Sequence, residues 1–175
     1  MANILIIYST TDGHTEKICR RLQQIIEDRD NRVTLVSIDA GSPLDLNAYD
    51  KVVIGASIRY GRHRPVVYEF IERNIKGLDS KSNAFFSVNV VARKPEKNRP
   101  ETNPYLRKFL KQIAWRPQRL AVFAGKIDYR KYKFWDRQII RFIMWITRGP
   151  TDPGTNIEFT DWEQVENFGR VICEM

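Results

Sequence analysis

Short apolar runs alternate with amphipathic helical patterns from the start of this chain, which leaves few folds open to it. Residues 4–8 form the first apolar run, and Ile18, Leu22, Ile25 and Ile26 then share one face of a predicted helix. Strands that alternate with helices are typical of βαβ units around a parallel sheet covered on both faces. The remaining strands are predicted at residues 33–38, 51–56, 84–91 and 120–124, and the remaining helices at residues 65–77, 106–113 and from Thr160 onward.

Size and composition are those of one ordinary globular domain. The chain has 175 residues, of which 42% are hydrophobic and 29% charged, so a packed core is expected. Gly77 is expected to end the second helix, and Thr160-Asp161-Trp162-Glu163 to form a capping box at the start of the last. A doubly wound α/β parallel sheet of this size is predicted to have the order 2-1-3-4-5, with a ligand at the switch point between strands one and three.

The loop after the first strand has the residues of a phosphate site. Ser9-Thr10-Thr11-Asp12-Gly13-His14-Thr15 runs directly into a helix, so its backbone N–H groups and hydroxyls can converge on an anion. No Gly-x-Gly-x-x-Gly follows this strand and no Gly-Lys-Ser/Thr is present, which disfavours dinucleotide and P-loop sites. A monophosphate such as that of FMN fits better, and a plain polar turn that caps the helix is the alternative.

The spacing Thr10-x-x-Gly13-x-Thr15 resembles the flavodoxin phosphate signature. In that signature a further Ser or Thr usually stands where this chain has Asp12. Because a carboxylate would repel a phosphate dianion, we expect either that Asp12 points outward or that backbone amides carry most of the binding.

Two further loops would flank a flavin ring in a flavodoxin architecture. Ser57-Ile58-Arg59-Tyr60-Gly61-Arg62-His63 follows the third strand, and Asn89-Val90-Val91-Ala92-Arg93-Lys94 follows the fourth. Tyr60 is expected to stack on the ring, Gly61 to allow close backbone approach, and N–H groups of residues 90–92 to bind its pyrimidine edge. The alternatives are that Tyr60 is a half-exposed loop aromatic and that His63 is a polar residue at a helix start.

Longer stretches carry a more specific resemblance. These are Val53-Ile54-Gly55-Ala56-Ser57-Ile58-Arg59-Tyr60-Gly61, Ser87-Val88-Asn89-Val90-Val91-Ala92-Arg93-Lys94-Pro95-Glu96-Lys97, Trp115-Arg116-Pro117 and Thr160-Asp161-Trp162-Glu163-Gln164-Val165. Over essentially its whole length the chain resembles the bacterial flavodoxin-type protoporphyrinogen IX dehydrogenases. The resemblance implies a flavodoxin-like domain over residues 1–175 that uses FMN to oxidise protoporphyrinogen IX to protoporphyrin IX in haem biosynthesis. Electrons would pass to menaquinone or ubiquinone.

The implied site follows from that resemblance. No side chain is assigned as catalytic, because flavin N5 would carry the chemistry, and no metal is expected. The propionates of the substrate are expected to bind Arg59, Arg62, Arg93, Lys94 and Lys97 around the inferred flavin edge. The expected cofactor-binding residues are Thr10, Thr11, Asp12, Gly13, His14, Thr15, Ser57, Ile58, Arg59, Tyr60, Gly61, Ser87, Val88, Asn89, Val90, Val91 and Ala92.

A basic, aromatic-rich insert at residues 126–156 is expected to interrupt the fifth strand. Within it, Arg137, Arg141 and Arg148 fall on one helical stripe, opposite Trp135, Ile139, Phe142, Ile143 and Ile146. Such a helix can lie among lipid headgroups, and packing against its own domain is the alternative. The expected membrane contacts are Trp135, Arg137, Ile139, Arg141, Phe142, Trp145 and Ile146.

The formal net charge of +8 indicates affinity for an acidic partner. Charge alone does not distinguish an anionic membrane, a nucleic acid and a carboxylate-bearing substrate. No recognised nucleic-acid module fits, so no nucleic-acid partner is expected. Without a secretory signal pattern, and with Cys19 and Cys173 expected as reduced thiols, we expect a peripheral protein on the cytoplasmic face of the inner membrane. The sequence does not decide whether the protein forms a homo-oligomer. The alternative functions are a flavodoxin-like electron carrier or quinone reductase, and a membrane- or nucleic-acid-binding module without flavin.

Overall fold

A five-stranded parallel sheet forms the centre of the computed structural model, which describes residues 1–41 and 43–175. Its order β2-β1-β3-β4-β5 confirms the predicted topology. β3 is buried along nearly its whole length, as expected for a central strand of a sheet covered on both faces. The strands are β1 (Asn3–Ser9), β2 (Arg32–Ser37), β3 (Lys51–Ser57), β4 (Ser82–Asn89) and β5 (Arg119–Ala124).

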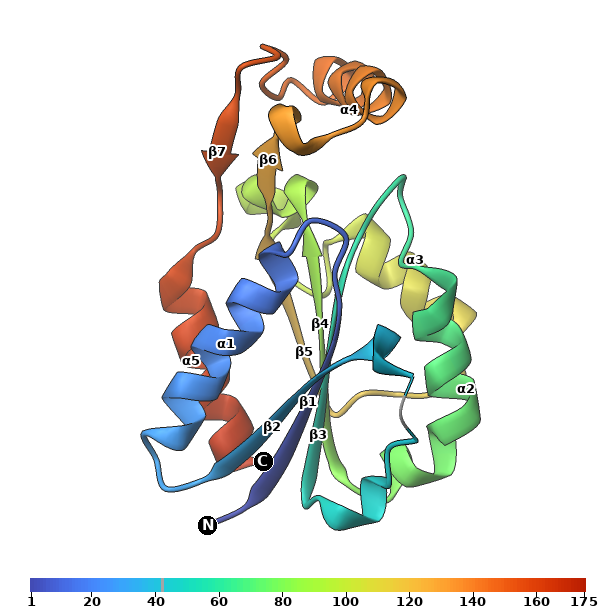
Figure 1. The fold of residues 1–175 in the computed structure, drawn as a ribbon, viewed down its shortest axis with the longest axis vertical. Helices are drawn as coiled ribbons and strands as arrows, with labels where there is room; N and C mark the ends of the chain where they lie inside the picture. The colour runs from blue at the N-terminus through green and yellow to red at the C-terminus, as the bar shows by residue number, and fades with distance from the viewer. Residues whose placement is uncertain (42) are drawn as a thin grey trace.

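Helices cover both faces of this sheet (Figure 1). On one face lie α1 (His14–Glu27) and α5 (Trp162–Glu174), and on the other α2 (Pro65–Asp79) and α3 (Pro104–Gln112). Of the predicted apolar face of α1, Ile18, Leu22 and Ile26 are buried against the sheet with Cys19, whereas Ile25 is half-buried. Burial raises the pKa of the Cys19 thiol. Short 3₁₀ turns occupy η1 (Ile38–Ala40), η2 (Leu46–Ala48), η3 (Val90–Arg93), η4 (Pro95–Lys97) and η5 (Tyr129–Lys131).

Three local predictions need correction. Gly77 does not end α2 but lies inside it, where an added Cβ would come within 3.0 Å of Leu46. The N-cap of α5 is Asp161, which accepts from the backbone of Glu163 and Gln164, so the cap is one residue later than predicted. β4 ends at Asn89 rather than at residue 91, because the Asn89 side chain caps a 3₁₀ turn there.

The insert stands above the carboxyl ends of the strands (Figure 1). It consists of β6 (Lys126–Asp128), η5, α4 (Phe134–Ile146) and β7 (Asn156–Glu158). β7 pairs antiparallel with β6 and not with the main sheet, so the predicted interruption of the fifth strand is not confirmed. The insert has a small core of its own, formed by Ile127, Tyr129, Tyr132 and Met144.

No helix in the described part of the chain is both long and apolar enough to cross a bilayer.

Candidate functional site

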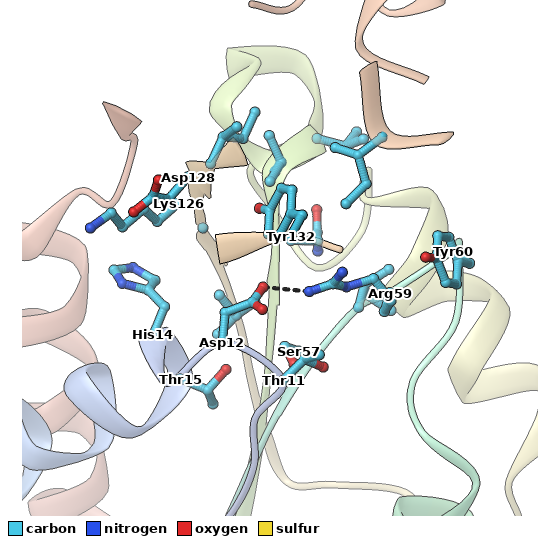
Figure 2. A pocket seen from close by; sticks show the side chains of 18 of the residues that line it. Thr11, Asp12, His14, Thr15, Ser57, Arg59, Tyr60, Lys126, Asp128 and Tyr132 are labelled. Atoms are coloured by element: carbon cyan, nitrogen blue, oxygen red, sulfur yellow. Dashed lines mark hydrogen bonds and ion pairs between the residues drawn. The ribbon is translucent and has the colours of Figure 1, made fainter. Parts of the chain in front are cut away.

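A cavity lies at the carboxyl edge of the sheet, between the loops after β1, β3 and β4 and the insert above them (Figure 2). The parallel topology brings these loops together, since all three follow strands that end at one edge. Most of the expected cofactor-binding residues line this cavity. They are Thr10, Thr11, Asp12, His14, Thr15, Ser57, Ile58, Arg59, Tyr60, Gly61, Val88, Asn89, Val90 and Val91.

The end of the cavity next to α1 has the features of an anion site. Gly13 has a left-handed backbone (φ 85°) and donates its N–H to the Thr10 hydroxyl at 2.9 Å. No side chain caps the start of α1 among the described residues, which leaves its first N–H groups for a ligand. The Thr15 hydroxyl is buried and has no hydrogen-bond partner in the described residues. Because buried polar atoms are rarely left unpaired, this hydroxyl supports a bound phosphate.

Asp12 is turned toward the loop after β3, where its carboxylate accepts a hydrogen bond from Arg59 at 2.5 Å (Figure 2). The Arg59 guanidinium also lies 5.0 Å from the centre of the Tyr132 ring, within the range of a cation–π contact. The Arg59 side chain is 17% exposed and that of Asp12 is 36% exposed, so the ion pair is partly accessible to solvent. This pair explains how a carboxylate is accommodated in the loop of residues 10–15: the opposite charge of Arg59 neutralises it.

The loop after β3 makes a tight turn at the edge of the cavity. Tyr60 and Gly61 both have left-handed backbones, with φ of 53° and 77°. The Tyr60 hydroxyl donates to the Asp136 carboxylate of α4, and this bond is the main cause of the raised pKa of Tyr60. The Ser57 hydroxyl is buried and, like that of Thr15, has no partner in the described residues. Tyr60 therefore connects the loop to the insert.

The loop after β4 differs from the prediction at two positions. The N–H of Ala92 donates to the Asn89 side chain at 3.0 Å, so it is not available to a flavin. Ser87 is completely buried and does not line the cavity. Gly13 also does not line the cavity, although it shapes the loop that does. Ser87 and Ala92 are thus corrected from cofactor contacts to residues beneath the cavity floor.

Two of the five basic residues expected to bind propionates are engaged with the protein. Arg59 is paired with Asp12. Arg93 donates to the carbonyls of Val90 at 3.0 Å and of Thr147 at 3.1 Å, and its partial burial lowers its pKa. In the described part of the chain, Arg62, Lys94 and Lys97 form no ion pair.

The resemblance implied that the insert helps to form the substrate and quinone surface, but sequence reasoning did not identify which of its residues line the cavity. Lys126 and Lys131 line the cavity, and Ile140, Ile143 and Met144 of α4 add an apolar surface to it. Helical periodicity indicated that α4 has two different faces. It grouped Ile143 with the outward aromatic residues, whereas Ile143 lines the cavity. The cavity is thus bounded by cationic as well as apolar groups from residues 126–146.

The outward face of α4 is strongly apolar. Exposed fractions are 76% for Trp135, 59% for Phe142, 71% for Trp145 and 61% for Ile146. Phe134 and Ile139 are exposed beside them, at 63% and 45%. An exposed apolar patch of this kind marks an interaction surface rather than a domain core.

Two of the expected membrane contacts point elsewhere. Arg137 donates to the carbonyls of Tyr129 and Tyr132, and Arg141 donates to the carbonyl of Thr151 at 2.8 Å. Their side chains therefore hold the helix to the rest of the insert. The physical reason is that backbone carbonyls of the insert lie beside α4, and a carbonyl oxygen can accept a hydrogen bond from a guanidinium group.

Three kinds of comparison describe what the chain is similar to. The family described as a flavodoxin domain matches residues 5–154. Protoporphyrinogen IX dehydrogenase (quinone) of Escherichia coli strain K12 is 43% identical over 171 residues, which are 98% of this chain and 94% of the other. The Leishmania major protein of the same name is 44% identical over 165 residues, 94% of this chain and 71% of the other. Oxidised flavodoxin 2 from Bacillus cereus has a TM-score of 0.55 at 18% identity, covering 99% of each chain, which shows a shared fold.

Proposed function

The chain belongs to the flavodoxin domain family, and from this premise we propose that it is an FMN-dependent oxidoreductase that oxidises protoporphyrinogen IX to protoporphyrin IX with a quinone as acceptor. The observation that carries the proposal is the 43% identity over nearly the full length of a relative named for that reaction. The same length includes the insert, so the part of the chain that covers the cavity is shared. The proposed place of the reaction is the porphyrin pathway.

The residues of the cavity suit FMN. The loop of residues 10–15 would hold its phosphate with backbone N–H groups and the unpaired hydroxyl of Thr15. Ser57 offers a second buried hydroxyl at the loop where the ring would lie. When bound, FMN supplies the electron-transfer chemistry, while the protein supplies position and charge.

The wall above the cavity suits the substrate. A porphyrinogen presents apolar faces and two propionates, and α4 offers Ile140, Ile143 and Met144 to such a face. Lys94 and Lys97 lie on η4 and its N-cap, free of ion pairs with described residues, and we assign them to the propionates as charge-assisted donors. Arg93 is left out of this assignment because it is bonded to backbone carbonyls.

We expect the purified protein, loaded with FMN, to produce porphyrin fluorescence from protoporphyrinogen IX in the presence of a quinone. Changing Lys94 and Lys97 together to glutamine should raise the KM for the porphyrinogen several-fold, because each lost charge-assisted hydrogen bond contributes about 1.5–3 kcal/mol at most and these groups are partly solvated. FMN affinity should stay unchanged, since neither lysine lines the cavity.

The matched control is a glutamine variant of Lys108 and Lys111 on the outer side of α3, which keeps the same net charge as the test variant. An equal rise in KM in both variants would show a general field effect rather than binding by Lys94 and Lys97. If bound FMN is reduced and reoxidised by other donors and acceptors but porphyrinogen is never oxidised, the protein is an electron carrier or a different quinone reductase.

We further propose that α4 places the protein on the anionic cytoplasmic face of the inner membrane. The exposed aromatic face supplies the apolar contact. In place of Arg137 and Arg141, the exposed cations at the two ends of the helix, Lys131, Lys133 and Arg148, would meet the lipid headgroups. Each basic residue near such a surface contributes about 1 kcal/mol.

Changing Trp135, Phe142 and Ile146 together to serine is expected to abolish sedimentation with phosphatidylglycerol vesicles while leaving the melting midpoint nearly unchanged. These side chains are 59–76% exposed, so little packing is lost with them. A buried residue of the same helix, Met144, gives the opposite control: Met144→Ser should lower the midpoint without selectively releasing the protein from vesicles. Undiminished sedimentation of the triple variant would exclude α4 as the membrane contact.

A further inference from the structure

Four polar side chains are buried together beneath the floor of the cavity. His63, Ser87, Asn89 and Asn103 are between 0% and 3% exposed. They come from three places in the polypeptide: the end of the loop after β3, the last three residues of β4, and the N-cap of α3. Burying polar groups is unfavourable unless they are hydrogen-bonded to one another, so their grouping needs a reason.

These side chains form one continuous hydrogen-bonded chain. Asn103 Nδ2 donates to Asn89 Oδ1 at 3.1 Å, and Asn89 Nδ2 donates to Ser87 Oγ at 3.3 Å. Ser87 Oγ lies 3.4 Å from His63 Nε2, and His63 Nδ1 lies 3.2 Å from the carbonyl oxygen of Ser57. That carbonyl can only accept, so Nδ1 carries the hydrogen and Nε2 accepts from Ser87.

The Asn89 and Asn103 amides donate to each other, and from Asn89 onward the direction of donation is the same at every link to the carbonyl of Ser57. Burial between Phe85 and Phe109 lowers the pKa of His63 to about 4, which keeps the imidazole neutral and able to accept at Nε2. Hydrogen bonds that point one way polarise each other and so form a more rigid unit than the same bonds taken singly.

The hydrogen-bonded side chains contact the backbone of each loop that bounds the flavin end of the cavity. At one end it holds the carbonyl of Ser57 in the β3 loop. In the middle, Asn89 Oδ1 also accepts the N–H of Ala92 and so fixes η3. At the other end, Asn103 Nδ2 donates to the carbonyl of Lys97 at 2.9 Å. This bond ties residues 93–100, called the basic loop below, to the same unit.

We propose that His63, Ser87, Asn89 and Asn103 are positioning residues that fix the two flavin loops, and the basic loop beside them, in binding geometry before the cofactor arrives. None of these side chains needs to touch the reacting atoms, and three of them lie outside the cavity lining. A loop that is already ordered binds its ligand more tightly, because less conformational entropy is lost on binding. The link to FMN rests on the proposed function, whereas the fixing of the loops does not.

Asn83 provides a matched control in the same strand. It is 1% exposed at the opposite end of β4, and its Nδ2 donates to the carbonyls of Leu78 and Lys81. An Asn83→Asp substitution therefore removes two buried amide donors, as Asn103→Asp does, but far along the strand from the cavity. Asn103→Asp keeps the side-chain oxygen that caps α3.

The test compares Ser87→Ala and Asn103→Asp with Asn83→Asp in the full-length apoprotein and after titration with FMN. Amide hydrogen exchange at residues 58–60 and 90–94 should be faster in the first two variants, and their FMN dissociation constants, from flavin fluorescence quenching, should rise about tenfold. Asn83→Asp should lower the melting midpoint as much, with loop exchange and FMN affinity within about twofold of wild type.

Two results would overturn the proposal. One is loop exchange unchanged by Ser87→Ala and Asn103→Asp. The other is an FMN affinity that falls equally in all three variants, in step with the melting midpoint. In that case the four hydrogen-bonded side chains would stabilise the fold without a specific effect on the loops. Failure of the wild-type protein to bind FMN would instead contradict the proposed cofactor, and the exchange measurement on the apoprotein would still decide whether these residues position the loops.

Discussion

Between pH 6.5 and about pH 4, the free energy of unfolding is expected to fall by about 3 kcal/mol through His63 alone. Burial lowers the pKa of His63 from 6.5 to about 4, so in this window the unfolded chain binds a proton that the folded protein does not. The contribution of His63 to the free energy of unfolding is fully present above pH 6.5, the pKa in the unfolded chain, and is lost as the pH falls from 6.5 to about 4. Below about pH 4 both states are protonated and the loss is complete.

Urea unfolding of the apoprotein at several pH values, beside His63→Gln, measures this effect. The variant should be less stable at pH 7, because it loses the packing of the imidazole against Phe85 and Phe109. Its stability should also depend less steeply on pH between 6.5 and 4, by up to about 1.4 kcal/mol per pH unit.

Other groups that titrate in this range remain in both proteins, so the difference between the two slopes isolates His63. Burial also lowers the pKa of His14, which contributes a slope of the same sign. Parallel pH profiles for wild type and His63→Gln would show that His63 is not kept neutral in the fold.

A valine in place of Gly13 is expected to weaken FMN binding at least tenfold. The backbone at Gly13 has φ 85°, a conformation that costs a β-branched residue about 1–2 kcal/mol or more. An added Cβ would meet no protein atom within 4 Å, so the strain is conformational rather than a clash. Relief of that strain would move the N–H groups of the phosphate loop away from the anion.

Gly41 is the matched control for this substitution. It has a left-handed backbone as well (φ 67°), again with nothing within 4 Å of an added Cβ, but it follows η1 and does not line the cavity. Gly41→Val should destabilise the fold comparably without changing the FMN dissociation constant. Equal FMN affinity in Gly13→Val and wild type would remove the loop of residues 10–15 from the cofactor site.

The position of the site was predictable because parallel strands end at one edge of the sheet. Once strands at residues 4–8, 51–56 and 84–91 were recognised, the loops that follow them had to meet there. The identity of the loop residues, from Thr10 to Thr15 and from Ser57 to Gly61, then followed from chain order. Most of the fold follows from hydrophobic periodicity in the same way.

Side-chain partners from distant segments were not predictable in this way. Ser87 and Asn89 belong to one strand and alternate with buried apolar residues, yet only the structure shows that His63 and Asn103 meet them. The pairing of Asp12 with Arg59 likewise joins two loops 47 residues apart. Sequence spacing carries no information on such contacts between elements.

The insert shows a second limit. Helical periodicity separates two faces of α4, but it does not say which carbonyls of a neighbouring segment lie beside the helix. Arg141 fell on the polar stripe and was therefore expected to face lipid, whereas it donates to the carbonyl of Thr151. Ile143, on the opposite stripe by sequence, lines the cavity.

The bond from Arg93 to the carbonyl of Thr147 has a mechanical consequence for the proposed placement of α4 on a bilayer. Arg93 belongs to η3, and Thr147 is the C-cap of α4, so one guanidinium joins the cavity floor to the far end of the helix. The Tyr60 hydroxyl holds the first turn of the same helix through Asp136. With both ends attached, α4 is held at a fixed position relative to the cavity. In the proposed membrane-bound state, the depth and tilt of α4 in the lipid would therefore set the height of the cavity mouth above the headgroups, and hence the distance that electrons would travel to the quinone.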